Sequence, residues 1–342
     1  MSLQQNEHKP KLNVRLLKQL LEMHRPSYES NAWLHKFIDP RMPPGASKVQ
    51  DEYGNVFVLV GDGEQADIAF TCHTDTVARA NSKPPKVKMT KGGVMFVSNP
   101  HEADCLGADD AAGIYIMLEM LEHGVTGRYC FFRDEEVGCQ GSSWSVKDRT
   151  GFWTGVKAMI SFDRRGDGII TQQRFARCCS DTFALELAKR LGRPASALQS
   201  GIYTDSAEFM QEVPECTNVG VGYMHEHTPD EVLDTVILED LLQHCVAPGT
   251  FSNLPIERVP VPYSGWGMLA SDYPEDEDPD LLSMFRELSQ LGKPELMRWI
   301  LDNPERAAVY IMIFSDYGFK QDIIETGTKV IKDWGGFDEL AA

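Results

Sequence analysis

Short apolar runs alternate with segments of helical periodicity between residues 56 and 245, and this alternation constrains the fold more than any other feature. Runs such as 67–72 and 158–162 are typical of buried strands, whereas 109–123 has apolar residues at helical spacing and ends at Gly124. Strands that alternate with helices form a mainly parallel sheet with helices on both faces. We therefore predict an α/β fold in which a mostly parallel, mixed β-sheet is sandwiched by helices.

The remaining predicted elements follow the same rules. A hairpin is predicted from two short apolar runs around the turn at 91–93. Further strands are predicted at 56–60, 129–132 and 217–222, and further helices at 13–24, 182–191, 205–213 and 238–245.

The composition excludes several classes of protein. The 342 residues include 33 Lys and Arg against 51 Asp and Glu, a net charge of −18, and 42% of them are hydrophobic. This is a globular composition, and its acidity argues against a nucleic-acid partner or a polybasic membrane surface. The chain has no run of about 18 apolar residues, and its polar residues 1–9 predict no secretory signal. Its eight cysteines lack a CxxC motif and are expected to be reduced, buried thiols of a cytoplasmic protein, with zinc–thiolate binding as the alternative.

The charge is unevenly distributed along the chain. Residues 261–342 contain 16 acidic and 7 basic residues, a net charge of −9, which is half of the total excess. This part also contains apolar residues at helical spacing, interrupted by prolines. We therefore divide the chain into an α/β domain over 1–250 and an acidic, mainly helical C-terminal extension over 251–342.

Five short segments contain most of the residues with metal-binding or acid–base chemistry. They are His73-x-Asp75, Gly107-x-Asp109-Asp110, Glu135-Glu136, Asp163 and His225-x-His227. Each has an ordinary structural alternative, such as a helix cap, a core histidine or a solvated loop. Most of them, however, follow a predicted strand or begin a helix, so they would meet at one edge of a parallel sheet.

Several carboxylates at one edge repel each other unless cations lie between them. Two divalent metal ions would remove that repulsion and could stabilise a hydrolytic transition state. Ligands of the imidazole and carboxylate type suit zinc, with manganese or cobalt as alternatives. The sequence therefore predicts a site for two divalent metal ions, most simply zinc.

The order of these segments resembles that of the dinuclear zinc exopeptidase superfamily, which includes aminopeptidases, peptidase T-like tripeptidases, carboxypeptidases and deacylases. The resemblance extends over residues 10–250 and includes Asp51-x-x-Gly54-Asn55 upstream. It implies five metal ligands: His73, Asp109, Glu136, Asp163 and His227. His73 and Asp163 would bind one metal, Glu136 and His227 the other, and Asp109 would bridge the two.

The resemblance also implies two further catalytic roles. Glu135 would be the general base, and Asp75 would accept the second N–H of His73 and so orient its ring. The peptide bond between Asp109 and Asp110 is expected to be cis. For the last ligand, His225 and His227 are both candidates, and His227 is favoured because Thr228, a proline and acidic residues follow it.

The spacing of the motifs distinguishes subfamilies. Only 35 residues separate His73 from Asp109 and 63 separate Asp163 from His227, so neither gap holds the lid or dimerisation domain that some members insert. The compact members are aminopeptidases, and we expect an aminopeptidase that acts on peptides, with homo-oligomerisation possible. The alternatives are a dipeptidase, a carboxypeptidase or an N-acyl amino acid deacylase on the same site. From another class, the alternative is a non-catalytic metal-binding or interaction protein with the same fold.

Two other features lie near the predicted site. Arg164 and Arg165 directly follow Asp163 and are expected to form surface or structural ion pairs, with a substrate carboxylate as the alternative partner. The segment 203–206 resembles a loop that borders the substrate pocket in related peptidases, with a helix N-cap as the alternative.

Overall fold

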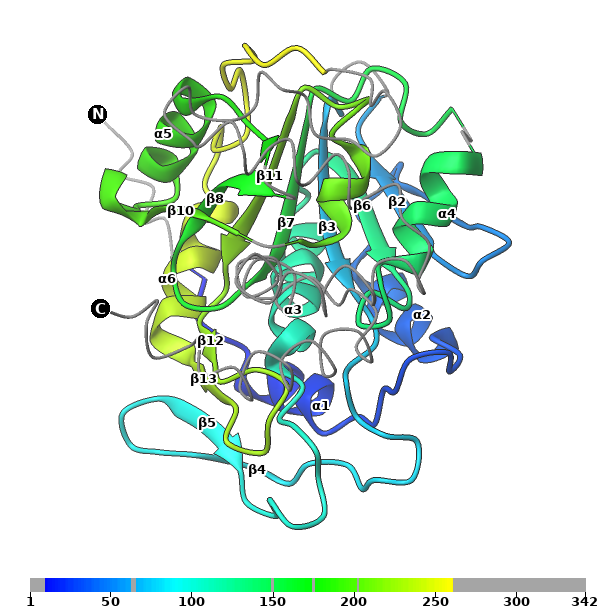
Figure 1. The fold of residues 1–342 in the computed structure, drawn as a ribbon, viewed down its shortest axis with the longest axis vertical. Coiled ribbons are helices and arrows are strands. Elements are labelled where there is room, and N and C mark those ends of the chain that lie inside the picture. The colour runs from blue at the N-terminus through cyan, green and yellow to red at the C-terminus, as the bar shows by residue number, and fades with distance from the viewer. Residues whose placement is uncertain (1–9, 63–65, 149–150, 174–175, 202, 261–342) are drawn as a thin grey trace, which may run out of the picture. The chain divides into compact units, whose positions relative to one another are not determined.

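The main β-sheet is mixed and has a parallel centre in the computed structural model, which describes residues 10–62, 66–148, 151–173, 176–201 and 203–260. Its strand order is β1-β2-β6-β3-β7-β11-β8-β10, and β9 pairs with β8 (Figure 1). The strands β6, β3, β7 and β11 are parallel to their neighbours within this group. These strands are β1 (Ser47–Gln50), β2 (Val56–Val60), β3 (Ile68–His73), β6 (Gly127–Phe132), β7 (Ala158–Arg164), β8 (Ile169–Gln173), β9 (Ala176–Arg177), β10 (Leu198–Ser200) and β11 (Glu215–Gly220). The predicted fold class is therefore confirmed.

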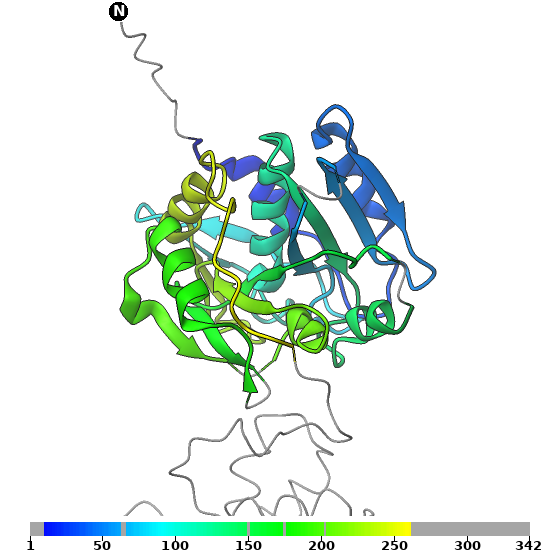
Figure 2. The same cartoon turned by 90° about the horizontal axis from the view of Figure 1, so that it is seen from above.

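Helices cover both faces of this sheet. On one face, α3 (Ala108–Glu122) packs on β3 and β7, while α1 (Val14–Leu21) and α6 (Thr235–Cys245) pack on α3. Figure 2 shows α4 (Gln140–Asp148) on the opposite side of the sheet from α3. The helices α2 (His35–Ile38) and α5 (Asp181–Arg190) complete the set of described α-helices.

The central helix α3 approaches the sheet very closely because of one glycine. Every residue from Ala108 to Leu121 is buried, as expected for a helix between a sheet and other helices. A Cβ atom on Gly113 would lie only 2.1 Å from the carbonyl oxygen of Phe162. Glycine at this position therefore allows the first turns of α3 to lie against the end of β7.

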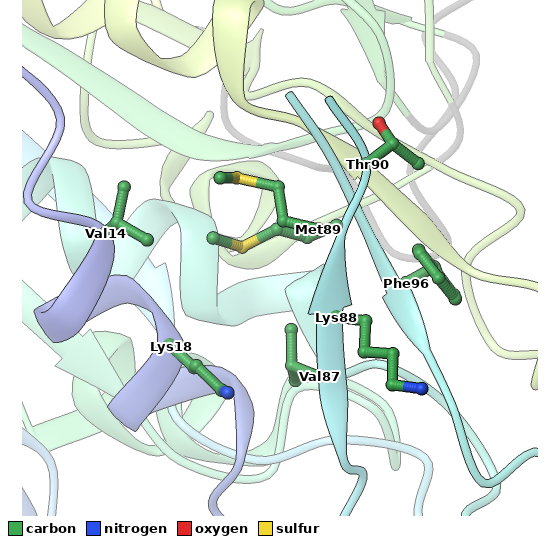
Figure 3. A pocket seen from close by; sticks show the side chains of 8 residues that line it. Val14, Lys18, Val87, Lys88, Met89, Thr90 and Phe96 are labelled. Carbon is green, nitrogen blue, oxygen red and sulfur yellow. The ribbon is translucent and has the colours of Figure 1, made fainter. Parts of the chain in front are cut away.

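A second, antiparallel sheet contains the predicted hairpin, which is confirmed. Its order is β12-β13-β5-β4, with β4 (Val87–Met89), β5 (Val94–Val97), β12 (Tyr223–Met224) and β13 (Val232–Asp234). An apolar pocket of about 490 Å³ lies between α1 and the β4–β5 hairpin (Figure 3). It is lined by residues such as Val14, Met89 and Phe96, and none of the predicted metal ligands lines it.

The structure corrects the prediction of a helix over 205–213. The described element there is a short 3₁₀ helix, η4 (Asp205–Phe209). Thr204, at the N-cap position, makes no capping hydrogen bond because its hydroxyl donates to Asp163 Oδ2 instead. The prediction also missed α4, whose nine residues include three serines and a glycine.

Residues 251–260 pack on the main sheet. The ring of Phe251 lies 4.7 Å from that of Phe70 on β3, and the guanidinium of Arg258 donates to the carbonyl oxygens of Met210 and Pro214. The predicted helical extension falls almost entirely on residues 261–342, outside the described residues. The division into two domains therefore stays a prediction.

The eight cysteines are all free and buried, as predicted. Among the described helices, none has both the length and the apolar character needed to cross a bilayer.

Candidate metal centre

The predicted site residues lie at one edge of the main sheet, where the neighbouring parallel strands β6, β3 and β7 end. His73 is the last residue of β3, Asp163 lies at the end of β7, and Glu135 and Glu136 follow β6. Asp109 lies in the first turn of α3, which begins at the same edge. Parallel strands present their carboxyl ends together, and the structure therefore brings these side chains together as the sequence predicts.

His73 lies among three carboxylates. Its Nε2 atom is 2.8 Å from Asp109 Oδ1 and 3.5 Å from Asp163 Oδ1, and its Nδ1 atom is 3.4 Å from Asp75 Oδ1. Burial lowers the pKa of His73, but the neighbouring carboxylates of Asp163, Asp109 and Asp75 outweigh it and raise the pKa well above its ordinary value. These carboxylates therefore favour the protonated, positively charged form of the imidazole when no metal ion is bound.

His227 approaches the same group from a loop. Its Nε2 atom is 3.2 Å from Asp109 Oδ2 and 3.1 Å from Glu136 Oε2. These two contacts raise the pKa of His227 to about 11. His225 is exposed, and its imidazole forms no hydrogen bond or ion pair with the described residues. The geometry therefore favours His227 over His225 as the ligand, and the assignment itself stays a prediction.

Acidic side chains outnumber cationic side chains around this centre. Divalent metal ions would fit the site if they compensated this excess of negative charge. Burial raises the pKa of Asp163 and raises that of Glu136 to about 7, so the carboxylates are poorly compensated by protein groups alone. Glu136 Oε1 is buried and has no hydrogen-bond partner among the described residues. An orphaned carboxylate oxygen beside two imidazoles is the arrangement that a divalent cation would complete.

Two overlapping groups of possible metal ligands can be traced in the described residues. One consists of His73, Asp109 and Glu136, and the other of His73, Asp110 and Asp163, with ligand atoms within 4.8 Å of one another in each. The second group differs from the implied set because it contains Asp110 where the resemblance uses Asp109. Asp110 already accepts hydrogen bonds from the backbone N–H groups of Gly113 (2.9 Å) and His73 (3.2 Å), so Asp109 is the better candidate for the bridge. The peptide bond between Asp109 and Asp110 is cis, as expected.

Glu135, the predicted base, and Asp75, the predicted partner of His73, are held by separate contacts. The Asp75 carboxylate accepts hydrogen bonds from the Ser27 hydroxyl (2.7 Å) and from the backbone N–H of Glu135 (3.1 Å). Glu135 is half-buried, and its Oε1 atom is 3.5 Å from the thiol of Cys139, which donates to it. Burial raises the pKa of Glu135 well above its ordinary value. A carboxylate of raised pKa accepts a proton more readily than an ordinary carboxylate, as a general base must.

Several residues that support the site were not assigned a role from the sequence. Glu231 is buried, and its carboxylate accepts from the backbone N–H groups of Gly107 (2.8 Å) and Asp109 (2.9 Å). This contact joins the loop that contains His227 to the start of α3. The only signal for it was the acidic residue four positions after His227.

Asp163 is held by three further side chains. Its carboxylate accepts from the hydroxyls of Thr204 (2.5 Å) and Tyr223 (3.1 Å). Its backbone N–H donates to Asn218 Oδ1 at 2.9 Å. The segment 203–206 thus reaches the site through Thr204, while Asp205 accepts from the Ser142 hydroxyl on α4 at 2.6 Å. Hydroxyl and amide partners from distant segments leave no pattern in the sequence.

Comparison with solved structures identifies the fold. An aminopeptidase, PepT, from Bacillus cereus matches with a TM-score of 0.55 and 14% sequence identity, covering 68% of this chain and 96% of that protein. A tripeptidase from Staphylococcus aureus matches with a TM-score of 0.54 and 15% identity over 68% of this chain and 95% of its own. The TET1 peptidase of Pyrococcus horikoshii matches with a TM-score of 0.53 and 16% identity over 68% and 98%.

The chain has the fold of these peptidases. No family model matches the sequence, and no curated protein matches it either. At 14–16% identity the likeness concerns the fold, so activity must be argued from the site.

Proposed function

We propose that this protein is a co-catalytic dizinc aminopeptidase that removes N-terminal residues from peptides. The observation that carries the proposal is the meeting of two imidazoles and three carboxylates from five separate segments, with Glu135 beside them. In this proposal the ligands are His73, Asp109, Glu136, Asp163 and His227. Manganese or cobalt could replace zinc at such a site.

In this proposal, Glu135 and Asp75 have separate roles in the reaction. When bound, the metal pair supplies Lewis acidity toward the scissile carbonyl and the attacking water. Glu135 takes a proton from that water and passes it to the leaving amine. Asp75 accepts the Nδ1 proton of His73, which leaves Nε2 of the ring free to bind metal. The raised pKa of Glu135 supports the second part of its task, because a weakly acidic carboxyl group holds the proton until the amine leaves.

Further observations support the broader assignment and two related proposals. The described residues hold no extra domain between the ligand segments, and the solved structures with this fold include an aminopeptidase and a tripeptidase. The Pyrococcus horikoshii peptidase is described as assembling into a tetrahedron or a large octahedral shell, and we propose homo-oligomerisation here as well. The eight free, buried thiols support a cytoplasmic location.

Metal analysis of the purified protein is the first test. We expect close to two zinc ions per chain, and a protein that contains no metal and is indifferent to EDTA would overturn the proposal. A panel of aminoacyl anilides, N-terminally blocked peptides and N-acyl amino acids then identifies the reaction. Preference for blocked termini would exclude an aminopeptidase.

A single substitution separates catalysis from metal binding. Glu135→Gln keeps the shape of the side chain but removes the base, so we expect turnover to fall by about 10²–10⁴-fold. The metal content of this variant should equal that of the wild type. Unchanged turnover in Glu135→Gln would rule out the assigned base.

A further inference from the structure

The second sheet has an outer strand, β4, whose outer edge is partly unpaired. Directly after β4, the Thr90 N–H donates to the carbonyl oxygen of Val94 on β5 at 2.9 Å. Facing pairs alternate along an antiparallel ladder, so Val87 and Met89 direct their backbone groups away from β5. Glu22 Oε1 accepts from the Val87 N–H at 3.1 Å, whereas no described residue accepts from the Met89 N–H. The edge of β4 is therefore closed at Val87 and open at Met89.

The open part of this edge borders the apolar pocket between α1 and the hairpin. Figure 3 shows Val14 on α1 and Met89 on β4 among the residues that line it. These two residues are 39% and 48% exposed, although both are apolar. An apolar pocket beside an unpaired strand edge is an arrangement to which an extended peptide adds as a further strand. The main chain of such a peptide would pair with β4, and its aliphatic side chains would enter the pocket.

The segments on both sides of the pocket are basic, although the whole chain has a net charge of −18. Residues 11–21, which include α1, contain three basic and no acidic residues, and residues 77–100, which include the hairpin, contain five basic and no acidic residues. Three of these eight side chains pair with acidic residues. The other five are exposed and have no ion pair with the described residues: Lys11, Arg15, Lys86, Lys88 and Lys91.

Acidic side chains that contact this surface are already engaged. Glu22 accepts from the Val87 N–H and pairs with Lys18, and Glu239 accepts from the Leu12 N–H at 3.0 Å. The five unpaired cations therefore favour an acidic partner. The unpaired strand edge favours a polypeptide, because nucleic acids and lipids have no row of N–H and C=O groups that matches a strand.

We propose that the edge of β4 binds an acidic segment of a partner protein, which adds to the second sheet as an extended strand. β4 has three residues, so the added strand pairs with it over about 10 Å. A second copy of this chain is a poorer occupant, because a two-fold contact through this edge would bring the same cations together. None of the proposed metal ligands lines the pocket, so this surface lies outside the proposed peptidase site.

Binding of a synthetic peptide to the full-length protein tests the proposal. The probe is a short peptide in which valine alternates with aspartate or glutamate, with an acetylated N-terminus and a fluorescent label on its blocked C-terminus. Acetylation also removes the free N-terminus on which the proposed aminopeptidase would act. Fluorescence anisotropy should report saturable binding that weakens as salt rises, and an analogue with lysine in place of the acids should bind at least about tenfold more weakly.

Backbone methylation separates strand pairing from attraction between charges. Two further peptides keep every side chain but are N-methylated on complementary sets of alternate residues. Only one set of N–H groups faces β4 in an extended strand, so one peptide should lose about tenfold in affinity and the other should bind as before. Equal affinity of the two methylated peptides would overturn the proposal.

Substitutions in the protein provide a second test with matched controls. Met89→Pro removes the outward N–H without breaking the ladder to β5, so the peptide should bind it about tenfold more weakly than Met89→Ala, which loses only the side chain. Lys88→Glu should weaken binding, whereas Lys36→Glu, at an exposed lysine of α2 that does not line the pocket, should not. Thermal unfolding checks that each variant is folded, and the methylated peptides decide the question if Met89→Pro is not.

Other occupants of the edge give different results. Absence of peptide binding, or equal weakening by Lys88→Glu and Lys36→Glu, would overturn the proposal. A dimer of the wild type that excludes the peptide and is abolished by Met89→Pro would also overturn it, because the occupant would then be a second copy. Displacement of the peptide by single-stranded DNA or by anionic vesicles at the same concentration of charge would overturn it as well, since neither can add a strand.

Discussion

The two halves of the metal centre are built differently. His73 and Asp163 lie at the ends of β3 and β7, and their side chains are only 1% and 8% exposed. His227 lies in the loop between β12 and β13, with a side chain that is 50% exposed and a backbone φ of 64°. The strand-borne half is thus held by the sheet itself, whereas the loop-borne half is held by a few hydrogen bonds. We expect changes in the first half to affect both folding and metal binding, and changes in the second to affect mainly metal binding.

The largest effect is expected for His73→Ala, in the strand-borne half. Removal of this buried imidazole leaves Asp109, Asp163 and Asp75 without their common partner, which should reduce the free energy of unfolding by about 3–5 kcal/mol. We also expect the loss of at least one metal ion and of detectable turnover. Denaturant unfolding and metal analysis measure the two effects. A stable variant with two metal ions would contradict the role of His73.

The next largest effect on metal binding is expected for His227→Ala, in the loop-borne half. One metal ion should be lost while the other stays bound, because His73 and Asp163 remain in place. The free energy of unfolding should change by less than about 1 kcal/mol, since the removed ring is half exposed. His225→Ala is the matched control and should keep both metals. If His225→Ala loses a metal instead, the assignment of the last ligand is wrong.

Glu231→Ala tests how the two halves of the metal centre depend on each other, because it removes the hydrogen bonds that join them. The variant leaves the backbone N–H groups of Gly107 and Asp109 without their acceptor, at a cost of about 1–3 kcal/mol for each buried donor. The His227 loop should then be less well held, and metal affinity should fall by about 10–100-fold. Competition with a chelator measures the affinity, and Glu231→Gln, which keeps one acceptor oxygen, should have a smaller effect. Equal metal affinity in all three proteins would show that the link is dispensable.

The smallest effect concerns the pH dependence of the metal-free protein. The pKa of His227 rises from 6.5 to about 11, so its stabilising contribution is complete below pH 6.5 and is lost as pH rises toward 11. The pKa of Glu136 rises from 4.5 to about 7, so the unfolded chain loses this proton first and the free energy of unfolding falls as pH rises through that interval. Both pKa shifts predict that the Tm of the protein in EDTA is lower at about pH 9 than at about pH 6.

Metal binding should reverse this trend. Because ligands bind metal in their deprotonated forms, the Tm difference between the zinc-loaded and the EDTA-treated protein should widen as pH rises. Thermal unfolding at the two pH values, with zinc or EDTA, provides the measurement. A difference that narrows with pH would contradict the proposed ligand chemistry.

Sequence reasoning succeeded where local pattern and local structure agree. The apolar runs of β3 and β7 are buried at every position from Ile68 to His73 and from Ala158 to Asp163, so their periodicity was informative. It failed at residues 205–213, where the Thr204 hydroxyl makes a distant contact in place of a helix cap. It also missed α4, because glycine and serine carry little helical signal.

The sequence alone therefore determined the central strands β6, β3, β7 and β11 and the helix α3, the edge at which the carboxylates gather, and the residue types suited to two metal ions. These follow from periodicity and from the rule that parallel strands end together. The tertiary structure decided which of the two histidines reaches Glu136, that Glu231 joins the two halves, and that Arg165 pairs with Glu226. Such facts depend on contacts between residues up to 124 positions apart, which no local pattern encodes.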